Sequence, residues 1–208
     1  MENPTTEPVN RAVYTDNEWD IPALSLEMQA WNVDYPINAW RTGSKTSKRA
    51  RTHHFYQADS HFTSLKKRPG LLLQTEAPTV VEPNYSLDPT TPRALGMEAI
   101  YRKRELAQYW GEHGRKIWVD MHVPAKYREL NLLGIPAGWN AYMTRGSVPR
   151  LLDIDDVLQA LDAELALARE FSGLDHPRFA VYAGPIETRD WCRDNRAIYI
   201  PNNRPDSH

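Results

Sequence analysis

The sequence predicts an α/β protein with a mostly parallel central sheet of about five strands, either an open sheet or a half-barrel. Three observations favour this class. A long helical stretch begins at Pro92, ends at Gly114 and leads directly into the apolar strand 116–123. A second periodic helix, 153–171, is followed by the apolar strand 178–183. Strand and helix patterns alternate along the chain, and repeated βα units require a parallel sheet with right-handed crossovers.

The stretch that begins at Pro92 has the pattern of a helix wedged between two layers. Thr91 suits the N-cap. Pro92 suits the first helical position, because the N–H that proline lacks would have no hydrogen-bond partner within the helix. Projected at about 100° per residue, the apolar side chains fall on two opposite sides: Leu95, Ala99, Leu106 and Trp110 on one, and Met97, Ile100 and Tyr101 on the other. Such a helix is expected to pack on both sides.

Shorter elements complete the predicted fold. We predict strands at 52–59, 79–84, 139–144 and 197–200, and short helices at 61–67 and 125–133. The helix 153–171 has Asp residues in its first turn and Gly173 after its end, both of which favour a helix with these limits. From Ile21 to Trp40 the apolar residues have no clean period, so we assign neither helix nor strand there.

The composition is that of one globular domain, with 41% hydrophobic and 25% charged residues. A formal net charge of −2 excludes a uniformly basic DNA-coating protein but allows a local basic patch. We predict a flexible arm over residues 1–20, a single α/β domain over 21–200 and a tail over 201–208. The single cysteine, Cys192, excludes an internal disulfide framework and a cysteine-rich zinc module.

Membrane and export signals are missing from the sequence. No stretch approaches the roughly 20 apolar residues of a membrane helix. The first residues have neither the basic start nor the apolar core of a signal peptide. We therefore expect no membrane association and a cytoplasmic location, in a bacterium or a host cell.

Polar side chains gather at the carboxyl ends of the predicted strands. The residues at these ends are Asp59, Glu82 with Asn84, Asp120 with His122, Thr144 with Arg145, and Gly184 with Glu187. In a parallel sheet these ends meet at one edge, where ligands usually bind. Asp120 and His122 could then act as acid and base, with Arg145 or Arg104 on an anionic group and Asp59 as a further candidate catalytic residue. A structural reading stays open as well, because position in a fold does not by itself establish function.

The histidines do not follow the spacing of a metal site. Enough potential ligands exist, namely His53, His54, His61, Asp59, Asp120 and His122. However, the adjacent His53 and His54 point to opposite faces of a strand, so at most one joins any site. His-Glu-x-x-His, Cys-x-x-Cys and the phosphate-binding glycine loops do not occur. We predict no metal site, and the cofactor is unknown.

The stretch from residue 41 to 68 is the strongest functional signal because it is basic within an otherwise acidic chain. It contains a single acid, Asp59, and eight cations: Arg41, Lys45, Lys48, Arg49, Arg51, Lys66, Lys67 and Arg68. These could neutralise phosphates, while the nearby Trp40 and Tyr56 could stack on unpaired bases. We predict contact with a nucleic-acid backbone or a single strand. The alternative is a solvated loop.

Several segments resemble one known family. They are His53-His-Phe-Tyr-Gln-Ala-Asp59, Glu82-Pro-Asn-Tyr-Ser86, Ile100-Tyr-Arg-Lys-Arg-Glu-Leu-Ala-Gln-Tyr-Trp110 before Gly114, and Phe179-Ala-Val-Tyr-Ala-Gly184. Over roughly residues 52 to 185 the chain is similar to the uncharacterised bacterial, phage and plasmid domain-of-unknown-function family 4417. The resemblance implies a mobile-element setting and carries over Arg104 as a structural or site arginine. Asn84 and Lys103 depart from the Asp and Asn that the family tends to have.

These observations predict a phage or plasmid protein that binds nucleic acid in the replication, processing or maintenance of the element. One alternative is an enzyme with an acid–base site at the strand-end rim that acts on a phosphorylated or small substrate. Another is a protein-interaction or virion component, including a host-defence antagonist, with Trp31, Trp40, Trp139 and Trp191 as candidate anchors. The expected partners are therefore nucleic acid or a protein.

Overall fold

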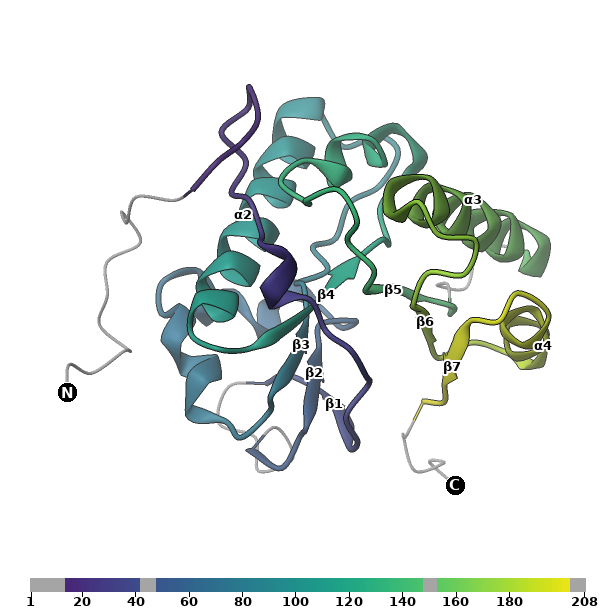
Figure 1. Ribbon diagram of the computed structural model, residues 1–208, viewed down its shortest axis with the longest axis horizontal. Helices are drawn as coiled ribbons and strands as arrows, with labels where there is room; N and C mark the ends of the chain where they lie inside the picture. Colours follow the sequence, from purple (N-terminus) through teal and green to yellow (C-terminus); the bar gives the residue numbers. More distant parts are fainter. Residues whose placement is uncertain (1–13, 42–47, 148–152, 203–208) are drawn as a thin grey trace. The chain divides into compact units, whose positions relative to one another are not determined.

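The computed structural model describes residues 14–41, 48–147 and 153–202, and it confirms the parallel α/β class (Figure 1). These ranges contain seven strands rather than about five. The chain divides into two compact units, which we describe one at a time. Unit 1 comprises residues 1–119 and 123–136, and unit 2 comprises residues 120–122 and 137–208. Our prediction of a single domain over 21–200 stays a prediction.

Unit 1 is built on parallel strands that follow one another in chain order. They are β1 (Ile37–Ala39), β2 (Thr52–His54), β3 (Thr79–Val81) and β4 (Lys116–Asp120), whose last residue belongs to unit 2. The register aligns Asn38 with His53, His53 with Val80, and Val80 with Ile117. Because side chains alternate along a strand, these four residues share one face of the sheet.

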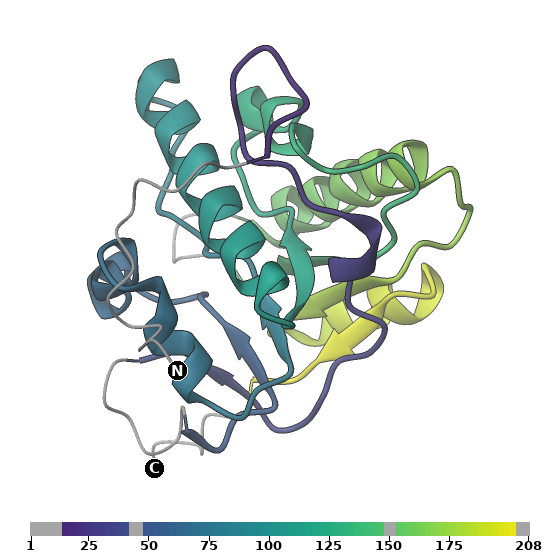
Figure 2. The same ribbon diagram turned by 60° about the vertical axis from the view of Figure 1, so that its left-hand side comes forward.

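The long helix α2 (Arg93–Glu112) covers that face, as Figures 1 and 2 show. The ring of Phe55, which continues the side of His53, stacks on Trp110 with 5.6 Å between centroids. Pro92 is the N-cap rather than the first helical residue, and the helix ends before Gly114, whose φ is +84°. Leu95 is exposed, so the expected packing on two opposite sides does not extend to the first turn.

Short 3-10 helices replace the short helices expected in unit 1. They are η1 (Leu26–Met28), η2 (Asp59–His61), η3 (Thr63–Lys66), η4 (Pro69–Gln74), η5 (Ala125–Tyr127) and η6 (Leu130–Leu132). Around η5 and η6, Tyr127 and Leu130 form a core cluster with Ile21, Ile100 and Val123.

The N-terminal segment of unit 1 is anchored to α2. Gln108 donates its side-chain amide to the carbonyls of Tyr14 and Ala23, at 2.9 and 2.7 Å. Residues 14–20 of the predicted arm therefore belong to the folded unit, whereas 1–13 lie outside the described residues. Strand β1 falls in the stretch that we left unassigned. Its three residues are too few to show a period.

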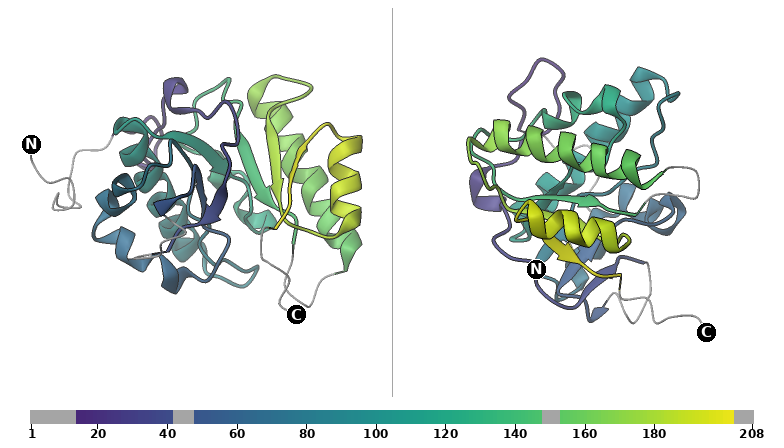
Figure 3. Two further views of the ribbon diagram at one scale, coloured as in Figure 1. Left: turned by 90° about the horizontal axis from the view of Figure 1, so that it is seen from below. Right: turned by 90° about the vertical axis from the view of Figure 1, so that its right-hand side faces the viewer.

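Unit 2 contains the parallel strands β5 (Tyr142–Arg145), β6 (Phe179–Tyr182) and β7 (Ile198–Ile200), again in chain order. Helices α3 (Ile154–Ser172) and α4 (Ile186–Asp194) lie on the same side of these strands (Figure 3). Asp153 caps α3 by accepting from the Ile154 N–H at 2.6 Å, and Gly173 ends it at φ +70°. The predicted limits of α3 are thus close to those observed, but α4 was not predicted.

Strand order has a direct consequence for where a site can form. Within each unit the order never reverses, and right-handed crossovers then all lie on one face. The described strands of each unit therefore lack the reversal point at which doubly wound sheets bind ligands. The observed strands are also shorter than predicted, so Asp59 lies in η2 and not at a strand end. Every helix in the described ranges is too short or too polar to span a bilayer.

Candidate functional site

The loop of residues 82–86, which we call the β3 loop, begins with a buried ionic cluster. Glu82 follows β3 directly and is fully buried. Its carboxylate accepts a hydrogen bond from the Arg104 guanidinium, and the Lys103 ammonium lies 3.8 Å from its other oxygen. Arg104 also donates to the carbonyl of Asn131 at 2.7 Å. Removing one member would leave a buried charge poorly compensated, so the cluster fixes the start of the loop against α2.

The other end of the β3 loop is held by Asp59. Both carboxylate oxygens accept from the Ser86 N–H, at 3.2 and 3.1 Å, and Oδ1 also accepts from the Ser86 hydroxyl at 2.9 Å. Tyr85 packs on Phe62, and burial, assisted by the Asp59 charge, raises the pKa of its phenol. Asp59 and Arg104, both predicted as catalytic residues, therefore position the same loop from its two ends.

The two adjacent histidines of β2 are buried and occupy consecutive strand positions, which face opposite sides of the sheet. His53 Nε2 lies 3.0 Å from Thr75 Oγ1, and burial lowers the pKa of its imidazole to about 4. His54 Nδ1 accepts from the Tyr56 N–H at 3.2 Å, so the proton of the neutral ring is on Nε2. Nowhere in the described ranges do three His, Cys, Asp or Glu side chains group so that they could hold a metal ion.

The other predicted catalytic residues belong to unit 2. Asp120 is fully buried, and its Oδ1 accepts from the His122 N–H at 3.2 Å, a local turn contact between a side chain and the backbone two residues on. Arg145 ends β5 and donates through Nε to the Ser147 hydroxyl at 3.0 Å. The shared rim with Asp59 and Arg104 joins both units and stays a prediction.

The described cations of the basic stretch 41–68 are exposed, but they fall into three parts of unit 1. Arg41 follows β1 and reaches His61 Nε2 at 3.0 Å, at the carboxyl side of the sheet. Lys48, Arg49 and Arg51 precede β2, at the amino edge, and all three are exposed. The third part lies at and after η3 and comprises Lys66, which is paired with Glu98 at 3.5 Å, and the exposed Lys67 and Arg68. Lys45 lies outside the described residues.

The aromatic residues that we predicted to stack on bases are buried. Trp40 is 3% exposed and Tyr56 is 7% exposed, so their rings are core and cannot receive a base in this conformation. Two exposed rings, Trp31 and Tyr35, precede β1. Sequence reasoning named Trp31 only as a protein-binding anchor and did not name Tyr35. No pattern in the sequence distinguishes these two rings from the buried ones, because exposure depends on what packs over each ring.

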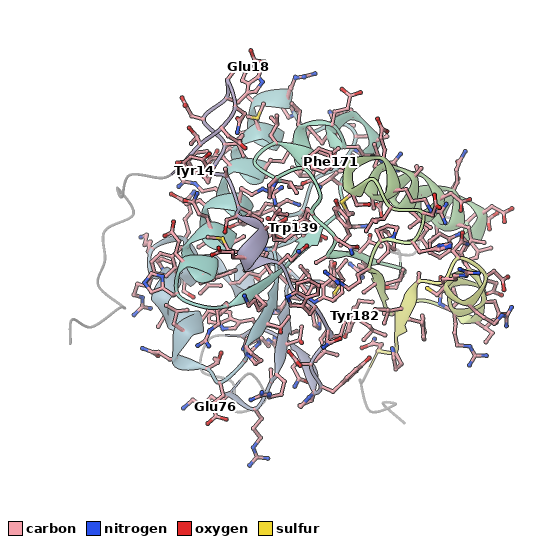
Figure 4. The ribbon with its side chains drawn as sticks, in the orientation of Figure 1. Tyr14, Glu18, Glu76, Trp139, Phe171 and Tyr182 are labelled. Carbon is pink, nitrogen blue, oxygen red and sulfur yellow. The ribbon has the colours of Figure 1, made fainter. Side chains whose placement is uncertain are left out.

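Three of the four tryptophans considered as protein-binding anchors are also core residues. Trp40, Trp139 and Trp191 are buried, and Trp139 donates its indole N–H to the carbonyl of Ala141 at 2.9 Å (labelled in Figure 4). Core packing explains these three, and Trp31 alone among the four is exposed.

Fold and contacts together define a parallel α/β protein whose β3 loop is fixed by buried charges. The chain belongs to the family described as Domain of unknown function (DUF4417), whose model matches residues 13–142. The match confirms the resemblance but starts before residue 52 and ends before 179–184, so the closing strand lies outside it. No curated protein and no solved structure matches the chain.

Proposed function

We propose that this protein binds nucleic acid through the amino edge of unit 1, in the replication, processing or maintenance of a phage or plasmid. The observation that supports this is a run of exposed cations, Lys48, Arg49 and Arg51, that have no carboxylate within ion-pair distance among the described residues. We call these three residues and Lys116 the basic edge. The mobile-element role rests on the resemblance and stays a prediction.

Backbone hydrogen bonds order the basic edge. The Arg51 N–H donates to the carbonyl of Pro36 at 2.8 Å, and its own carbonyl accepts from the Thr79 N–H at 3.3 Å. The Lys116 N–H donates to the carbonyl of Pro78 at 2.8 Å. Arg51 therefore directly precedes β2 and Lys116 begins β4, two places away in the sheet, about 10 Å at 4.8 Å per strand. A phosphate backbone with charges about every 3.4 Å per strand can meet both.

Alanine substitution of Lys48, Arg49 and Arg51 together tests the proposal. Each cation that neutralises a phosphate contributes about 0.7 to 0.9 to the slope of log affinity against log salt. The triple variant should therefore bind DNA more weakly at low salt, with a slope shallower by about 2 to 3. Fluorescence anisotropy with a labelled oligonucleotide between 50 and 200 mM salt, roughly the range in which such slopes develop, measures both quantities.

A charge-matched control keeps the test specific. Arg189, Arg193 and Arg196 are exposed residues of unit 2, and their triple alanine variant has the same change in net charge. It should keep the affinity and slope of the unchanged protein. Equal losses in both variants, or no binding by the unchanged protein at low salt, would contradict the proposal.

A second candidate function is the acid–base enzyme acting on a phosphorylated or small substrate. The buried cluster of Glu82, Lys103 and Arg104 favours it, because two cations and a carboxylate at the end of a parallel strand suit an anionic reactant. Activity toward a panel of phosphorylated compounds that is lost in Lys103→Gln, measured well below the melting temperature of that variant, would support this function. A panel on which the unchanged protein has no activity would count against it.

A further inference from the structure

Residues 30–36, which we call the crossing segment, run across unit 1 from β4 to β1. At one end the Ala30 N–H donates to the carbonyl of Ile117 at 2.9 Å. The Trp118 indole then donates to the carbonyl of Asn32 at 3.3 Å. These contacts fix the first half of the segment beside β4. Because Trp118 lies on the face opposite α2, the segment passes over that face.

The second half of the crossing segment is fixed by Asp34. Its carboxylate accepts from the Thr79 hydroxyl at 2.6 Å. The backbone carbonyl of Asp34 accepts from the Thr52 hydroxyl at 2.7 Å, and the Asp34 N–H donates to the oxygen of that hydroxyl at 3.0 Å. Since Thr79 begins β3 and Thr52 begins β2, the segment is held on the amino side of both strands, and Pro36 then meets Arg51.

Two large aromatic rings project from this fixed backbone. Trp31 is 61% exposed and Tyr35 is 55% exposed. Five of the seven tryptophans of the chain are buried, and Trp19 is the other exposed one. A ring held outward on an anchored backbone loses little conformational freedom when a flat partner stacks on it, and aromatic rings of this kind concentrate at binding surfaces.

We infer that the crossing segment binds single-stranded nucleic acid, with unpaired bases stacked on Trp31 and Tyr35 and phosphates on the basic edge. The inference rests on the proposed function and names its substrate class. The Arg51 N–H donates to the carbonyl of Pro36, the neighbour of Tyr35, so the cation and the ring belong to backbone segments that are hydrogen-bonded to each other. Every base has a π-face, whereas in a duplex those faces are covered by the neighbouring pairs.

The cations next to Tyr35 favour a nucleic acid over a protein partner. The acids nearest to this surface along the chain are Asp34, whose carboxylate is already bonded to Thr79, and the exposed Glu27, Glu76 and Glu112, of which Glu76 is labelled in Figure 4. Lys48, Arg49 and Arg51 are exposed and have no carboxylate within ion-pair distance among the described residues. Exposed aromatic rings and such cations match the stacking platforms and positive grooves of single-strand binding proteins.

The test compares an oligo-dT of about the length of one small binding site, roughly 4 to 16 nucleotides, with a duplex of equal length. The variants are Trp31→Ala, Tyr35→Ala and the pair together, with Trp19→Ala as the matched control because its ring is 50% exposed and lies outside the crossing segment. Each lost stacking contact should weaken oligo-dT binding by roughly 5- to 150-fold. Duplex binding by the double variant should stay unchanged.

Tryptophan fluorescence gives an independent readout. Oligo-dT should quench part of the emission of the unchanged protein, and Trp31→Phe should remove that quenching while Trp19→Phe keeps it. If the unchanged protein binds both oligonucleotides and the double variant binds them equally well, the inference is wrong and the proposed function stands. An equal loss on duplex and single strand also overturns the inference. If neither oligonucleotide binds at low salt, both proposals fail and a protein partner takes their place.

Discussion

Replacing Arg104 with methionine tests how strongly the ionic cluster stabilises unit 1. The change removes the guanidinium that Glu82 accepts from and the bond to the carbonyl of Asn131, while methionine fills much of the same volume. Glu82 then keeps Lys103 at 3.8 Å, a longer and weaker contact. Removing one partner of a buried pair typically costs about 3–5 kcal/mol, because the remaining charge stays out of water. We expect a loss of unfolding free energy in this range.

Urea unfolding followed by tryptophan fluorescence measures that loss. At about 2–4 °C per kcal/mol for a chain of this size, the melting temperature should fall by roughly 6–20 °C. The control is Arg102→Met on the same helix, where the arginine is half-buried and bonded to Glu105 at 3.0 Å. A partly exposed pair of this kind contributes up to about 1 kcal/mol. Equal losses at 102 and 104, or a loss below about 1 kcal/mol at 104, would refute the reasoning.

Two further predictions concern stability. Burial lowers the pKa of His53 from 6.5 to about 4, so between these values the unfolded chain binds the extra proton. Stability is thus complete above pH 6.5 and falls by up to about 3 kcal/mol as the pH approaches 4. His53→Gln should flatten this part of the pH profile in chemical denaturation, and an unaltered profile would contradict the assignment. Gly96→Ala should lose about 1–3 kcal/mol despite better helix propensity, because the new Cβ overlaps the Tyr127 ring. Gly111→Ala, whose new Cβ has the flexible Met28 side chain as its nearest neighbour, should lose less by thermal melting, and the reverse order would refute the packing argument.

The fold class could be predicted because the longest elements are strongly patterned. The helix α3 has an acidic N-terminus, a 3.6-residue apolar period and Gly173 at its end, and its limits were predicted to within a residue at each end. The elements that the sequence did not predict are short. Strand β1 has three residues, and α4 has nine residues with few apolar side chains, so neither offers enough length for a period to be recognised. Their existence depends on the neighbours that they pair with or cover.

The sequence predicted two residues of the candidate site but not the contact between them. Glu82 was identified as an acid at a strand end and Arg104 through the family resemblance, whereas their ion pair was not predicted. One signal was available: Lys103 and Arg104 follow Ile100 by three and four residues and precede Ala107, the spacing of a buried helix face. Cations in such a stripe require a buried carboxylate opposite them. No comparable signal reports which aromatic ring stays outside, because exposure is decided by what packs over each ring.

Under the proposed function, unit 1 separates the residues that stabilise it from those that bind nucleic acid, with one group at each edge of the sheet. At the carboxyl edge, Arg104 and Asp59 fix both ends of the β3 loop, so a substitution there changes the unfolding free energy first. At the amino edge, Trp31 and Tyr35 are exposed, and removing them leaves the anchoring bonds of Asp34 intact. Variants of the two edges should then differ in kind. Arg104→Met should lower the melting temperature, and any loss of DNA binding should follow unfolding, whereas the Trp31 and Tyr35 double variant should lose single-strand affinity at an unchanged melting temperature. Binding loss in Arg104→Met while the protein is still folded would place the ligand at the carboxyl edge, where parallel α/β proteins usually bind theirs.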